Sequence, residues 1–161
     1  MGPFRRRREN RRRPDGHRER AVSALVRLRA RPDLVRAAIG DSDQYVRIAG
    51  IEGFGEMGGP EAIPVLTKII DDEKIDVSER IAGVTGLRRA GTTEATDQLA
   101  KAMDVPDPEV ARAAMRFLTS MHGMKWWNSP PDPANKEEWA RKKAILLKVK
   151  HLTQPNTVGG D

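Results

Sequence analysis

Apolar positions recur in the middle of the chain at spacings of 33 and 31 residues, counted from Val46, Glu79 and Val110. Within each copy, apolar side chains follow one another at intervals of three and four residues, which predicts helices rather than strands. Matching positions at a period of roughly 20–50 residues are typical of stacked helical units. The pattern therefore predicts an all-α fold built from a repeated unit. The matched sets are Ala49, Ala82 and Ala113; Ile51, Val84 and Met115; Phe54, Leu87 and Leu118; and Met57, Ala90 and Met121.

Turn residues divide each copy into two helices. In the second unit Asp43 is the expected N-cap of the first helix. Residues 58–60, Gly-Gly-Pro, form the turn before a return helix over residues 61–70. Residues 91–93, Gly-Thr-Thr, are the equivalent turn of the third unit, and a fourth first helix covers residues 107–122. We therefore expect three to four helix pairs, since a shorter unit also precedes the second one.

The repeat pattern ends on both sides in segments of different composition. Three prolines among residues 130–133 exclude a helix where the fourth return helix would follow. Helical periodicity resumes near residue 135, which predicts an atypical C-terminal capping helix. The expected organisation is a disordered Arg-rich arm (1–17), a helical repeat domain (18–123), a Trp/Pro-rich connector (124–134), a capping helix (135–152) and a tail (153–161).

The second unit, residues 41–66, has the most regular form of the repeat. Its sequence, Asp-Ser-Asp-Gln-Tyr-Val-Arg-Ile-Ala-Gly-Ile at the start, resembles the short bacterial HEAT-like repeat, of the type also found in phycobilin lyase proteins. Residues 107–114 match the opening of that repeat again. The resemblance implies a right-handed α-solenoid and a role as a scaffold, adaptor or enzyme accessory. It also implies that Arg47 and Arg80 are structural, and that Ala111 breaks the series.

A solenoid presents a large surface without a built-in active site, so we expect a noncatalytic protein-binding scaffold rather than an enzyme. The return helices carry lysines at equivalent positions, Lys68 and Lys101, which mark the expected binding surface. Trp126 and Trp127 either extend this surface as an exposed anchor or close the end of the array, with Trp139 stacked on one of them. The partner is another protein, whose identity the sequence leaves open. Accessory work of the lyase type on a bound cofactor is a further option, implied by the resemblance alone.

The positive charge lies at the ends of the chain, although the net charge is only +6. Residues 1–31 carry twelve arginines against three acids, whereas residues 32–124 carry ten basic residues against sixteen acids. The arm could bind nucleic acid through phosphate contacts. It could equally be a solvated tail, or reflect composition or a misplaced start. The candidate arginines are Arg5, Arg6, Arg7, Arg8, Arg11, Arg12 and Arg13.

Other chemical motifs have simpler explanations. Residues 53–58 fit the dinucleotide fingerprint G-x-G-x-x-G, but no strand precedes them and they fall in the helical register, which favours close helix packing. Asp71, Asp72, Glu73 and Asp76 could hold a weakly bound cation, but a solvated loop is the simpler reading. The chain has no cysteine, and its three histidines have no metal spacing. We expect no cofactor or metal, no signal peptide or membrane segment, and a cytoplasmic protein.

Overall fold

A computed structural model describes residues 16–125 and 129–152. All regular structure in these residues is helical, which confirms the predicted all-α class. The chain forms two compact units, Met1–Gly91 and Thr92–Asp161. The first unit contains α2 (Gly16–Arg27), α3 (Pro32–Ala38), α4 (Gln44–Met57), the short 3₁₀ helix η1 (Gly59–Glu61), α5 (Ala62–Asp71) and α6 (Val77–Ala90). The second contains α7 (Thr93–Ala102), α8 (Pro108–Met121) and α9 (Lys136–Leu152).

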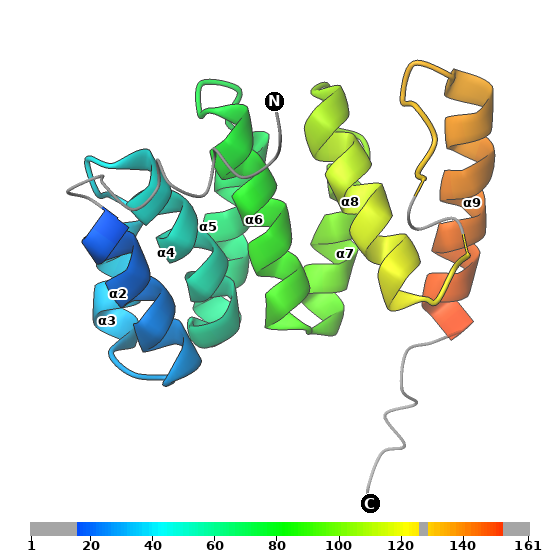
Figure 1. The fold of residues 1–161 in the computed structure, drawn as a ribbon. Helices are drawn as coiled ribbons and strands as arrows, with labels where there is room; N and C mark the ends of the chain where they lie inside the picture. The colour runs from blue at the N-terminus through cyan, green and yellow to red at the C-terminus, as the bar shows by residue number, and fades with distance from the viewer. Residues whose placement is uncertain (1–15, 126–128, 153–161) are drawn as a thin grey trace, which may run out of the picture. The chain divides into compact units, whose positions relative to one another are not determined.

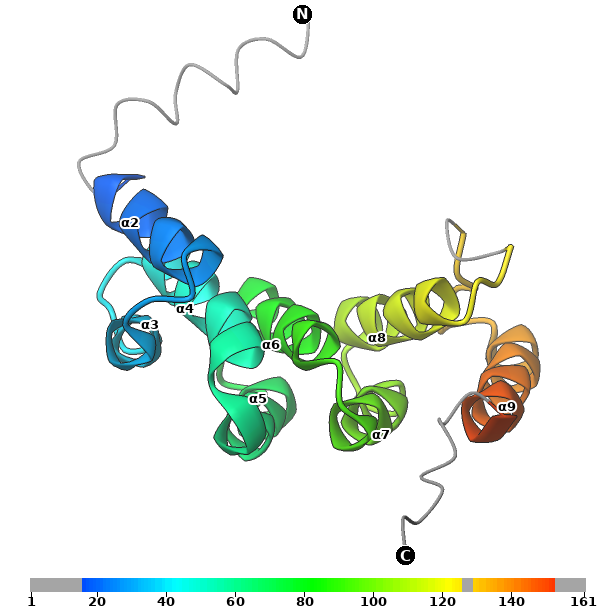
Figure 2. The same ribbon diagram turned by 90° about the horizontal axis from the view of Figure 1, so that it is seen from below.

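The first unit consists of two layers of helices. The first helices of successive pairs, α2, α4 and α6, lie side by side in one layer, and the return helices α3 and α5 form the other (Figures 1 and 2). The third predicted pair is divided between the units, because α6 belongs to the first and α7 to the second. The boundary falls at Gly91, which has a φ of 65° and ends α6 in the left-handed conformation that favours glycine.

Aspartates at the repeat spacing begin three of the helices. The side chain of Asp43 accepts hydrogen bonds from the backbone N–H groups of Tyr45 and Val46, at 2.9 and 3.2 Å. Asp107 does the same at the start of α8. Asp76 accepts from the backbone N–H of Ser78 at 2.9 Å. Each carboxylate satisfies amide donors that have no partner inside the helix. Asp76 is therefore a helix cap in the structure.

The matched apolar positions form the core, with one exception. Ile51, Val84 and Met115 are buried, as are Phe54, Leu87 and Leu118. In the last set Met57 and Ala90 are half-buried, whereas Met121 is 41% exposed at the end of its helix. Glu79 lies at an otherwise apolar position and is only 8% exposed.

The second unit ends in α9, whose Leu146 is 1% exposed. The Lys143 ammonium group bonds the carboxylate of Asp104, and the guanidinium of Arg112 contacts Asp132 at 3.1 Å. Trp139 is half-buried on α9. These contacts hold α9 and the segment before it to the end of α7 and to α8. In the part of the chain described, no helix combines the length and apolar character that crossing a membrane requires.

Candidate protein-binding surface

The glycines of the G-x-G-x-x-G motif bring helices together. Gly53 and Gly55 lie inside α4 and Gly58 is its C-cap, so the motif lacks the strand–turn–helix setting of a dinucleotide site. A Cβ atom at Gly55 would lie 2.0 Å from the carbonyl oxygen of Gly86 on α6. A Cβ at Gly53 would lie 2.3 Å from Cγ2 of Val26 on α2. The predicted role in helix packing is confirmed, and we call the contact between Gly55 and Gly86 the glycine seam.

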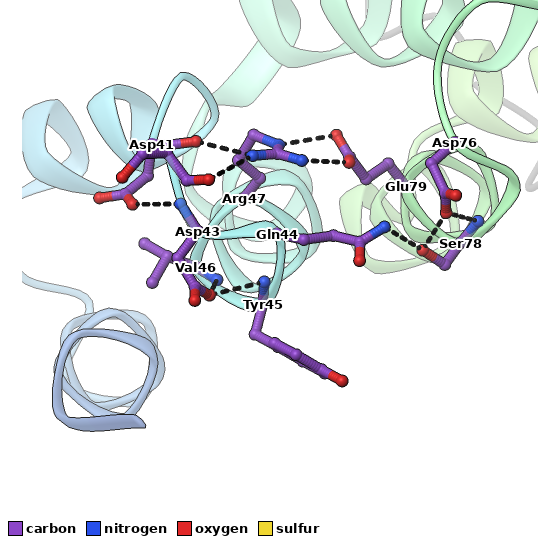
Figure 3. Close-up of polar contacts among 10 residues, drawn as sticks. Asp41, Asp43, Gln44, Tyr45, Val46, Arg47, Asp76, Ser78 and Glu79 are labelled. Atoms are coloured by element: carbon purple, nitrogen blue, oxygen red, sulfur yellow. Dashed lines mark hydrogen bonds and ion pairs between the residues drawn. The ribbon is translucent and has the colours of Figure 1, made fainter. Parts of the chain in front are cut away.

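A bidentate ion pair joins α4 to α6 at their N-terminal ends (Figure 3). The Nη2 and Nε groups of Arg47 donate to the two carboxylate oxygens of Glu79, at 2.7 and 3.1 Å. The Nη1 group donates to the backbone carbonyls of Asp41 and Ser42, at 2.9 and 3.0 Å. The hydrogen bonds to Glu79 raise the pKa of Arg47 above its already high value. The Arg47 guanidinium therefore stays charged and ties α6 to α4 and the loop before α4.

Two further contacts support the same junction. Arg80 is 3% exposed, and its Nε group donates to the carbonyl of Ile70 at 2.8 Å. That carbonyl lies in the last turn of α5, where backbone acceptors lack helical partners. The side-chain amide of Gln44 donates to the hydroxyl of Ser78 at 3.1 Å, beside the ion pair in Figure 3. Arg47 and Arg80 thus have the structural positions that the resemblance implied.

The first unit also has a hollow of about 570 Å³ between α2 and α4. Its floor contains Val26, Ala49 and Ile48, and Ser23 and Tyr45 lie beside them. Tyr45 is 43% exposed. Charged side chains complete the lining: Glu19 and Arg27 from α2, Glu52 and Glu56 from α4, and Arg89 from α6. We call this hollow the α2–α4 groove.

The predicted site residues lie in different parts of the molecule. Lys68 is exposed on α5 of the first unit, and Lys101 is exposed on α7 of the second. The structure does not bring either lysine to the α2–α4 groove, whose lining comes from α2, α4 and α6. Trp126, Trp127 and the candidate arginines between residues 5 and 13 lie outside the described residues, so their roles stay predictions.

Two of the four carboxylates considered as cation ligands, Asp72 and Asp76, have local hydrogen-bond partners. Asp72 accepts the backbone N–H of Lys74 at 3.0 Å, and Asp76 bonds Ser78 through both its backbone N–H and its hydroxyl. Those hydrogen bonds lower the pKa of Asp76, the one from the hydroxyl most of all. Among the residues described, no group of three or more histidine, aspartate or glutamate side chains is placed to hold a metal ion.

Sequence reasoning did not find the α2–α4 groove. Its residues follow helical spacings, at positions 19, 23, 26 and 27 of α2 and 45, 48, 49, 52 and 56 of α4. In the sequence these positions look like ordinary helix faces. The one sequence feature that could have indicated the groove is the small size of Ser23 on α2 and Ala49 on α4, which both line it.

A comparison with known families agrees with the helix pairs. A family model described as HEAT repeats matches residues 10–82, which include α2 to α5 and the start of α6. No curated protein matches the chain. The match supports the predicted α-solenoid class, whereas the handedness, the number of pairs and the phycobilin lyase type stay predictions. Residues 10–82 are therefore similar to HEAT repeats, in agreement with the repeated helix pairs and their aspartate caps.

Proposed function

We propose that the protein is a noncatalytic protein-binding scaffold or adaptor of the cytoplasm. One observation carries the proposal: polar side chains near the starts of α4 and α6 cap helices or join them. Asp43 and Asp76 cap helices, Arg47 pairs with Glu79, and Arg80 bonds the end of α5. Because these side chains are engaged in holding the fold, the exposed faces are left to provide function. HEAT repeats are commonly protein-interaction scaffolds.

The proposed binding residues lie on the return helices, Lys68 on α5 of the first unit and Lys101 on α7 of the second. Both ammonium groups are exposed, so they can pair with carboxylates of a partner at the rim of an interface. The test is a crosslinking pull-down with the double variant K68E/K101E and, as a matched control, K74E. Lys74 is also exposed, but it lies in the loop after α5. Loss of a discrete partner with K68E/K101E and its retention with K74E is the expected result. Equal recovery by both variants would contradict the use of this surface.

A second candidate function is nucleic-acid binding through the arm. The observation that favours it is the seven arginines among residues 5–13. Arginine contacts with phosphates release counterions, so binding of this kind weakens steeply as salt increases. Affinity for a duplex oligonucleotide, measured between low and physiological salt, tests it. Removal of residues 1–15, which leaves α2 intact from Gly16, should abolish a salt-dependent affinity that the arm provides. Accessory work of the phycobilin lyase type rests on the resemblance alone.

A further inference from the structure

The α2–α4 groove is built from two parallel helix faces. The start of α2 lies beside the start of α4, because Arg18 pairs with Asp41 at 3.1 Å. The ends of the same helices also lie together, since Arg29 is 3.9 Å from Glu56. The groove therefore follows both helices, and Glu19 and Arg27 mark its two ends on α2. They are eight positions apart in the sequence, which is about 12 Å along the helix axis.

The floor of the groove suits apolar side chains. Val26 is 6% exposed, and Ile48 and Ala49 are half-buried beside it. The short side chains of Ser23 and Ala49 line the hollow along the contact between the two helices, where Val26 packs against Gly53. Larger side chains of a bound segment can therefore enter the hollow. Packing a ridge of side chains on one helix into a groove on another is the usual way in which helices associate.

The charged residues that line the groove determine which charge pattern a bound segment should have. Within the described residues, no hydrogen bond or ion pair involves Glu19 at one end of the groove. Arg27 lies at the other end, and no hydrogen bond or ion pair within the described residues involves it either. The remaining charges of the lining are paired, since Arg89 contacts Glu52 at 2.8 Å and Glu56 lies 3.9 Å from Arg29. A segment such as residues 5–13, with seven arginines and one glutamate, would bring excess positive charge against Arg27, and a purely acidic segment would bring negative charge against Glu19. Charge complementarity therefore favours a segment with a base at one end and an acid at the other.

We propose that the α2–α4 groove binds an amphipathic helix of a partner protein, with a basic residue beside Glu19 and an acidic residue beside Arg27. The two charged residues of that helix are seven or eight positions apart, with apolar residues at spacings of three and four between them facing the floor. This inference rests on the proposed protein-binding function, but it assigns the partner to the layer of first helices. The surface is distinct from the one that carries Lys68.

The test uses photo-crosslinking from two positions of the full-length chain. A benzoylphenylalanine replaces Tyr45, an exposed aromatic residue of the groove, or Lys68 on the return helix, and crosslinked peptides are sequenced from the source cell. The expected result is a single segment crosslinked from position 45 that has the predicted spacing of apolar and charged residues. Crosslinks from position 45 to residues 1–15 of the same chain, to a second copy, or to no segment at all would overturn the inference.

A peptide of the crosslinked segment then tests the charge pairing. The variant E19K should weaken its binding roughly fivefold or more, and a peptide with its basic residue reversed to glutamate should recover that loss. The variant S23R, which fills the groove, should abolish binding while the helical circular dichroism signal and melting temperature stay close to wild type. Unchanged affinity in E19K and S23R contradicts the inference. Crosslinks to a partner from position 68 alone would overturn the groove assignment but would agree with the protein-binding function. An absence of crosslinks from both positions would contradict the groove assignment and the protein-binding function.

Discussion

Replacing Gly55 with alanine separates two opposite expectations about the glycine seam. In an isolated helix, alanine is more favourable than an interior glycine by about 1 kcal/mol, so helix propensity alone predicts a more stable protein. In the structure, the new Cβ would lie 2.0 Å from the carbonyl oxygen of Gly86, and 2.4 Å from its carbonyl carbon. These are backbone atoms of a neighbouring helix, so no side-chain rotation relieves the contact.

The geometry gives the size of the effect. Ordinary contact begins near 3.4 Å, so α4 and α6 would have to separate by more than 1 Å at this point. Overpacking of a well-packed core costs roughly 1–3 kcal/mol, and a backbone contact belongs at the upper end of that range. After the gain from helix propensity, we expect G55A to lower the free energy of unfolding by about 2 kcal/mol, or the melting temperature by about 4–8 °C.

Urea unfolding followed by circular dichroism at 222 nm measures this difference. The control is G40A, because a Cβ at Gly40 would meet only the carbonyl oxygen of Ala37, at 3.8 Å, and the backbone there is not left-handed. G40A should leave stability unchanged or raise it by up to about 1 kcal/mol. A G55A protein as stable as the wild type, or more stable, would refute the packing argument for the seam.

Three further predictions concern the polar contacts. A double-mutant cycle with R47A and E79A should give a coupling energy of about 1.5–3 kcal/mol, because the ion pair is bidentate and partly shielded from solvent. A coupling energy near zero would contradict the role of this pair in joining α4 and α6. Burial lowers the pKa of His122, so the unfolded chain binds this proton first, and the free energy of unfolding falls as pH decreases below about 6.5. The variant H122Q should flatten that part of a pH titration of the melting temperature, and an unchanged slope would contradict this. Hydrogen bonds from Ser78 lower the pKa of Asp76, so this carboxylate stabilises the folded state above about pH 4, and the stabilisation is lost as pH falls further. The variant D76N should therefore have a lower melting temperature than the wild type at pH 7 and the same melting temperature in acid. Melting temperatures that differ by the same amount at every pH would contradict this.

The helix pairs were predictable because local patterns determine them. Intervals of three and four residues placed the apolar faces, and Asp43 and Asp107 marked helix starts that the structure contains. The repeat register also argued against a dinucleotide-binding role for the G-x-G-x-x-G motif, since Gly53 and Gly55 lie inside a repeated helix rather than after a strand.

What the sequence did not show depends on contacts between distant residues. Glu79 occupies an apolar register position because its partner is Arg47, 32 residues earlier on another helix. The α2–α4 groove arises where small side chains from two helices meet, and no single helix shows it. Met121 lies at a repeated apolar position but is exposed. The repeat pattern predicts on which side of the helix Met121 lies, but it does not predict whether another element covers the last turn of that helix.

The most direct test of the protein-binding proposal is a crosslinking pull-down from the source cell's lysate with the full-length chain and with a chain lacking residues 1–15, each with and without nuclease. The truncation removes the seven arginines of residues 5–13 and leaves every described helix complete. The account predicts one discrete protein partner, held by both chains and unaffected by nuclease. Recovery that requires the arm and disappears with nuclease would contradict it, and would indicate a nucleic-acid-binding protein instead.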